Sequence, residues 1–221
     1  MPIQIDKLVR SKRRTIALIV ERDGRLTVRA PMRTSQREIE SFVAEKADWI
    51  ERTRRKMKSN ILTPKQYVDG ERFLFLGSSF DLRLVRPQRP SLKFDNGFYL
   101  SRSAEKRGEA VFTRWYKKRA LEIIAERVNQ FAKRHGFSPK QVRITSARTR
   151  WGSCSPDGTL NFTWRLAMAP LEVIDYVVVH ELAHLRVKNH SKRFWRAVES
   201  ILPDYKRQRK WLSEHGEKLT L

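Results

Sequence analysis

Alternating apolar and polar residues dominate the first hundred positions of the chain, and this pattern predicts strands. Ile16, Leu18 and Val20 would lie on one face of such a strand, and Asp23-Gly24 supplies a hairpin turn after it. The expected strands are residues 3–9, 14–21, 25–30, 71–76, 79–85, 91–95 and 97–101. The first half of the chain is therefore predicted to be rich in β-structure.

Two long stretches have the helical spacing of apolar residues instead. One opens at Thr34-Ser35 and is expected to run as a single amphipathic helix to about residue 58. The other covers residues 108–134, and Gly136 is placed to cap its C-terminal end. The chain thus combines strands and helices in separate segments, which indicates an α+β fold.

A short sheet is predicted directly ahead of a third, strongly apolar helix. Residues 141–149 read as a strand, residues 150–158 as a tight turn, and residues 160–166 as the antiparallel partner strand. Pro170 then starts the helix. If residues 161–166 line a cleft, an extended peptide could add to that strand through backbone hydrogen bonds.

The third helix carries polar residues whose spacing points to a metal site. His180 and His184 lie four residues apart, so both imidazoles share one face of the helix, and Glu181 lies beside them. Neutral imidazole suits Zn²⁺ at about 2.0–2.1 Å, and three protein ligands leave a fourth position for a water whose pKa falls towards about 7. Glu181 would take the proton from that water. A buried helix with two incidental histidines is the plainer interpretation, but burying such polar groups is costly unless a metal satisfies them.

The third ligand and the oxyanion donor are open between named alternatives. His190 follows the helix after a turn and is favoured as third ligand because it is adjacent in sequence, while Glu199 on the next helix is the rival. Tyr205 and Arg150 are candidates to stabilise the oxyanion. Cys154 is expected to pack as a small hydrophobic residue rather than to bind metal.

Charge and composition widen the range of partners without selecting one. The chain has 47 Lys and Arg against 24 Asp and Glu, a net charge of +23, which favours acidic partners such as nucleic acid or nucleotides. These residues recur along the whole chain, however, as a solvated surface does. We expect a cytoplasmic protein that does not enter membranes, because no long apolar run is present and a single cysteine fits a reducing compartment.

Several motifs together resemble the YgjP-like zinc metallopeptidase family, which is related to the SprT-like and WLM-type proteases. They are Arg150-Trp151-Gly152-Ser153-Cys154, Leu166 to Pro170, His180 to Leu185, Asn189 to Ser191, and Phe194-Trp195. The similarity extends over nearly the whole chain. It implies a zincin-like domain with the metal helix packed under an antiparallel sheet, zinc held by His180, His184 and His190, and Glu181 as the catalytic residue.

The combined expectation is an α+β protein with a β-rich N-terminal part over residues 1–103 and a zincin-like domain over residues 104–221, unless the two form one continuous domain. That second part would contain long helices, a small antiparallel sheet and the metal-binding helix. The expected function is zinc-dependent hydrolysis of peptide or protein substrates with Glu181 as general base. The alternatives are a metal-dependent nucleotide or phosphoanhydride hydrolase, and a basic nucleic-acid-associated protein with protease activity.

Overall fold

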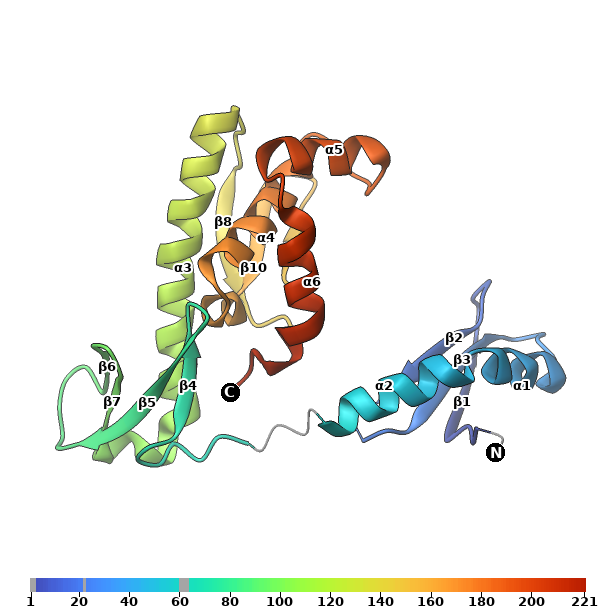
Figure 1. Cartoon of the computed structure of the whole chain (residues 1–221), viewed down its shortest axis with the longest axis horizontal. Helices are drawn as coiled ribbons and strands as arrows, with labels where there is room; N and C mark the ends of the chain where they lie inside the picture. Colours follow the sequence, from blue (N-terminus) through green and yellow to red (C-terminus); the bar gives the residue numbers. More distant parts are fainter. Residues whose placement is uncertain (1–2, 22, 60–63) are drawn as a thin grey trace. The chain divides into compact units, whose positions relative to one another are not determined.

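The computed structural model describes residues 3–21, 23–59 and 64–221, apart from the side chains of residues 56–59. Its contacts divide the chain into two compact units, Met1–Thr63 and Pro64–Leu221, each with its own hydrophobic core. Both units combine small sheets with helices in separate segments (Figure 1), so the α+β expectation is confirmed. The boundary expected near residue 103 falls inside the second unit.

The first unit is a three-stranded sheet with two helices. β1 (Lys7–Ser11) and β2 (Ala17–Val20) flank β3 (Leu26–Pro31), parallel to it on one side and antiparallel on the other. Gly24 has φ 85, the left-handed conformation that the predicted hairpin turn requires. The buried core of the unit is formed by Val20, Leu26, Val28, Ala30, Ile39, Val43 and Ile50.

The helix predicted over residues 34–58 is two helices, α1 (Gln36–Glu45) and α2 (Ala47–Ser59). Ser35 caps α1 as expected: its Oγ accepts a hydrogen bond from Glu38 N at 3.2 Å, and the Glu38 carboxylate accepts one from Ser35 N at 2.8 Å. Lys46 ends α1, because its backbone, with φ −97 and ψ 13, leaves the helical conformation. No residue in this stretch predicts the break, since Lys is a good helix former.

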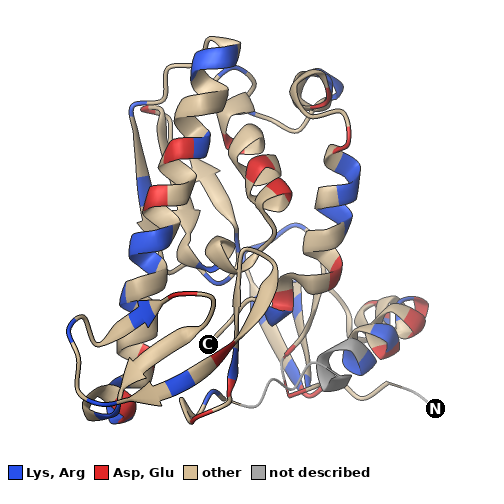
Figure 2. Cartoon of the chain, turned by 60° about the vertical axis from the view of Figure 1, so that its left-hand side comes forward, with Lys and Arg blue, Asp and Glu red and all other residues tan. Residues whose placement is uncertain are grey.

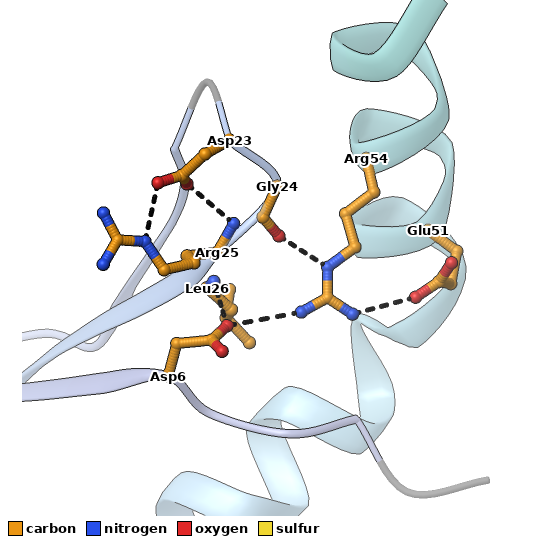
Figure 3. Close-up of polar contacts among 7 residues, drawn as sticks. All are labelled: Asp6, Asp23, Gly24, Arg25, Leu26, Glu51 and Arg54. Atoms are coloured by element: carbon orange, nitrogen blue, oxygen red, sulfur yellow. Dashed lines mark hydrogen bonds and ion pairs between the residues drawn. The ribbon is translucent and has the colours of Figure 1, made fainter.

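One arginine joins α2 to the sheet of the first unit (Figure 3). Arg54 Nε donates to the carbonyl of Gly24 at 2.9 Å, and its guanidinium pairs with Glu51 at 3.1 Å and with Asp6 at 3.6 Å. The Asp6 carboxylate also accepts a hydrogen bond from Leu26 N at 2.6 Å. Arg54 therefore links the helix, the hairpin turn and the segment before β1.

The second unit begins with a four-stranded mixed sheet that packs on a long helix. Its strand order is β4 (Arg72–Phe75), β5 (Ser78–Val85), β7 (Phe98–Ser101), β6 (Leu92–Phe94), with β5 and β7 parallel. Phe73 stacks on Phe112 of α3 (Gly108–His135) with ring centroids 4.2 Å apart. The helix ends at Gly136, which has φ 64 and caps it as predicted.

The sheet next to the candidate site differs from its prediction. β10 (Thr159–Thr163) is the central strand; it pairs in parallel with β8 (Gln141–Thr145) and antiparallel with β9 (Gly152–Cys154). The turn at residues 155–158 closes directly between β9 and β10, so β8 has to take the other edge of β10. The small sheet is therefore mixed rather than antiparallel, and its edge strand next to the metal helix is β9, not residues 161–166.

Three helices complete the second unit. α4 (Leu171–Ala183) is buried against α3, α5 (Lys192–Ile201), α6 (Tyr205–His215) and β9, as Figure 1 shows. A 3-10 helix, η2 (Trp164–Met168), replaces the end of the strand predicted to residue 166. Among the described residues, no helix has both the length and the apolar character needed to cross a membrane. Lys and Arg are spread over many elements of the chain rather than gathered on one (Figure 2).

Candidate metal centre

The structure brings the three predicted histidine ligands together. His180 lies in the last turn of α4, His184 is its C-terminal cap, and His190 precedes Ser191, the residue at the N-cap position of α5. The Nε2 atom of His190 lies 2.9 Å from Nε2 of His180 and 3.2 Å from Nε2 of His184. The ligand atoms of all three lie within 4.8 Å of one another.

This geometry fits one shared cation better than any arrangement of protons. A ring nitrogen holds either one hydrogen or one lone pair, so His190 Nε2 can form a hydrogen bond with only one of its two histidine neighbours. Two Zn–N bonds of about 2.0–2.1 Å at a tetrahedral angle place their nitrogens ~3.4 Å apart, close to the separations found. Burial, followed by the charges of His184 and His190, lowers the pKa of His180 to about 3, so its imidazole is neutral and suited to a metal.

The turn between His184 and His190 is held at two points. His184 Nδ1 lies 3.0 Å from the carbonyl of Val187, and an N–H at Nδ1 leaves the lone pair of Nε2 free for a metal. Arg186 donates hydrogen bonds to the carbonyls of His135 and Gly136, both at 2.8 Å. The turn is thus tied to the end of α3. Ser191 stands at the N-cap position of α5, although its side chain makes no capping hydrogen bond.

Glu181 follows His180 on α4 and is almost fully enclosed. Glu181 is only 4% exposed. Within the described part of the chain, neither Oε2 of Glu181 nor Nδ1 of His180 has a hydrogen-bond partner. Burial raises the pKa of Glu181 to about 8, and the positive charge of Arg150 opposes that rise. Buried polar atoms without partners are rare in folded proteins and are typical of functional sites.

The other residues singled out in the sequence fall around this cluster. Glu199 is exposed and pairs with Lys206 at 3.3 Å, and the metal-binding group formed by the described residues does not include it. Tyr205 is buried and its ring stacks on Trp195, with centroids 5.4 Å apart. Cys154 lies outside the histidine group in the same described set, and its thiol is 3.5 Å from the carbonyl of Ser155.

Two aromatic residues, Phe194 and Trp195, pack against the histidines, a contact that the sequence did not predict. Phe194 is fully buried, and its ring centroid lies 4.9 Å from that of His180, 4.5 Å from that of His184 and 4.8 Å from that of His190. Trp195 stacks on His190 at 5.7 Å. The aromatic pair at the start of α5 therefore packs against the imidazoles. In the sequence it was noted only as one of the motifs of the family resemblance.

Comparison with known proteins shows which family this chain belongs to. A model of the YgjP-like metallopeptidase domain matches residues 14–215. Among solved structures, the crystal structure of the metallopeptidase zymogen of Pyrococcus abyssi abylysin matches with 24% identity and a TM-score of 0.38, covering 41% of this chain and 93% of that one. No curated protein matched. The chain belongs to the YgjP-like metallopeptidase domain family and is a metal-dependent hydrolase that acts on peptide or protein substrates.

Proposed function

We propose that this chain is a zinc-dependent metallopeptidase in which His180, His184 and His190 bind the metal and Glu181 is the general base. The convergence of three Nε2 atoms beside a buried carboxylate carries this proposal. A set of imidazole nitrogens suits Zn²⁺, whereas Mg²⁺ and Ca²⁺ prefer oxygen ligands. Three ligands also leave a coordination position open for chemistry, unlike a structural zinc site with four.

Each side chain has a defined task in peptide hydrolysis. Zinc, when bound, supplies the Lewis acidity that polarises a substrate carbonyl and activates a water. Glu181 accepts a proton as the water oxygen attacks the carbonyl carbon, and it delivers that proton to the amine nitrogen as the C–N bond breaks. Arg150 is the proposed donor to the oxyanion, because its positive charge acts on Glu181 and opposes the rise in the pKa of that carboxyl. Tyr205 is better explained as support for Trp195, on which it stacks.

The edge of β9 offers a place for the substrate backbone. β9 pairs with β10 on one side only, and it packs against α4, the helix that carries Glu181. An extended peptide that adds to this edge gains backbone hydrogen bonds with little dependence on its sequence. The earlier candidate, residues 161–166, cannot serve, because β10 already has a partner on both edges.

The two alternatives gain no support from the site. Hydrolysis of nucleotides would favour oxygen ligands for Mg²⁺, and the described metal group consists of three histidines. A nucleic-acid partner rests on the +23 charge alone, and those charges are distributed over many elements (Figure 2). Nucleotide hydrolysis is one outcome of the experiment that tests the proposal.

The test is metal content and activity measured on the same preparations. Purified wild-type protein is expected to contain about one zinc per chain by mass spectrometry and to cleave fluorescein-labelled casein. His190→Ala should lose most of the zinc, and Glu181→Gln should keep the zinc and lose cleavage. Glu199→Ala is the matched control and should keep both.

Three results would overturn the proposal. Wild-type protein that binds no zinc would remove the metal site, and His190→Ala that keeps full zinc would remove this ligand set. In the third result, the wild type leaves casein intact and releases phosphate from nucleoside triphosphates, and that release is abolished in Glu181→Gln. The site would then be one for phosphoanhydride hydrolysis.

A further inference from the structure

The side chain of Glu181 is confined by the backbone of the neighbouring strand at Gly152. A Cβ atom placed on Gly152 would lie 2.5 Å from Oε1, 2.7 Å from Cγ and 2.8 Å from Cδ of Glu181. Real Cβ atoms do not approach other heavy atoms that closely. Strand β9 therefore lies directly against the Glu181 side chain, and only a residue without a Cβ permits this.

The alternation of residues along β9 supports this arrangement. Successive side chains in a strand point to opposite faces, so Gly152 and Cys154 share one face of β9. The contacts at Gly152 place the Glu181 side chain on this face. Trp151, just before β9, lies instead against Gly216, where an added Cβ would come 2.6 Å from its ring.

We propose that Gly152 is the positioning residue for Glu181: its missing side chain lets β9 approach and hold the carboxylate in the place from which it exchanges protons with water and substrate. This inference rests on the proposed function. Gly152 of the Trp151-Gly152-Ser153 motif thereby has a specific role beside the carboxylate.

The nature of the contact separates this role from a purely structural one. The three atoms nearest to the Cβ belong to the Glu181 side chain, not to the backbone. A side chain can shift where a backbone cannot, although the Cγ of Glu181 lies near the helix backbone and moves less freely than the end of the side chain. Gly152→Ala should therefore fold and keep its histidine cluster, but its Glu181 carboxylate should be displaced.

The test compares Gly152→Ala with Gly97→Ala in zinc content, urea unfolding and casein-cleavage kinetics. Gly97 is a fair control, because the atoms around its Cβ lie at ordinary contact distances of 3.5–3.9 Å. We expect Gly152→Ala to keep its zinc and its KM and to lose kcat by about 100-fold, the effect of misplacing a catalytic group by roughly 1 Å. Gly97→Ala should match the wild type in all three.

A second pair of variants provides a readout that does not depend on activity. Glu181→Ala removes the three atoms that the new Cβ meets, so Gly152→Ala should lower the urea midpoint in the wild-type background and not in the Glu181→Ala background. An equal shift in both backgrounds would overturn the inference, and so would wild-type kcat in Gly152→Ala. If Glu181→Gln itself keeps full activity, the proposed function fails instead, while the stability cycle still reports on the contact.

Discussion

Arg186 lies in the turn between α4 and α5. Its loss should weaken zinc binding even though all three proposed ligands are kept. Its guanidinium donates to the carbonyls of His135 and Gly136 and lies 4.1 Å from the ring centroid of Phe137. Because this turn leads from His184 to His190, we expect Arg186→Ala to loosen the third ligand and to weaken zinc binding about tenfold, the lower end of the effect of removing outer support from a metal site.

A chelator competition on purified protein measures this affinity. Arg134→Ala is the control, since it removes an equal charge from an exposed position at the end of α3. Equal zinc affinity in Arg186→Ala and the wild type would show that the turn holds its conformation without this anchor.

The site residues differ in how far the sequence could reveal them. The helical period places His180, Glu181 and His184 together, and adjacency suggests His190, because each of these relations is local. Gly152 meets Glu181 only through the pairing of β9 and the packing of α4, and no spacing rule predicts a contact of that kind. Glycines carry no chemistry of their own, so their role at a site becomes visible only in three dimensions.

Among the elements, α3 and α4 share a hydrophobic core and are also joined by an ion pair. Arg127 on α3 holds Asp175 on α4 through two contacts, Nε to Oδ1 at 2.5 Å and Nη2 to Oδ2 at 2.6 Å, and both side chains are less than one-fifth exposed. The hydrogen bonds to Asp175 raise the pKa of Arg127 above its usual value, so the guanidinium stays charged at all ordinary pH. Asp175 therefore anchors α4 to α3.

We expect Arg127→Ala to lower the free energy of unfolding by about 2 kcal/mol, because it leaves a mostly buried carboxylate without its partner. Urea unfolding of the zinc-free protein gives this value directly. Lys118→Ala, at an exposed position on the same helix, should change it by less than about 0.5 kcal/mol. A loss no larger than in that control would mean that water replaces the arginine at Asp175.

Helix α1 offers a test of a feature that the sequence did predict. The reciprocal hydrogen bonds between Ser35 and Glu38 satisfy two backbone N–H groups at the start of the helix. Ser35→Ala should therefore destabilise the first unit by about 1 kcal/mol, whereas Ser35→Asp should be close to neutral. Circular dichroism during thermal unfolding compares the two variants, and equal melting of both would argue against a capping role.

Strand pairing was the least predictable aspect of the elements. The turn at residues 155–158 predicts a hairpin, but it does not indicate which earlier strand pairs with the strand that follows. Residues 141–145 have the same alternation whether they pair in parallel or antiparallel, so their parallel register with β10 is decided by the crossover through residues 146–151 and by packing on α3. Local patterns fix the presence of a strand, while its neighbours depend on the whole sheet.

For the whole molecule, the division after Thr63 predicts how stability and metal binding are distributed. All the proposed ligands and Glu181 lie in the unit Pro64–Leu221, together with the aromatic core around Phe73, Phe98 and Phe112. The first unit has a separate and much smaller core. A domain of roughly 60 residues buries only about 60% of the surface of its unfolded chain and is marginally stable, so the first unit should unfold first.

We therefore expect residues 64–221, expressed alone, to fold and to bind zinc as the full chain does. Calorimetry of the full chain should show a small first transition that is absent from the fragment, and added zinc should raise only the second, since a ligand stabilises the unit that binds it. Residues 64–221 with His184→Ala are the control and should fold without that shift. A fragment that aggregates or loses zinc would show that residues 1–63 are needed to complete the site-bearing unit, and the two cores would then form one cooperative structure.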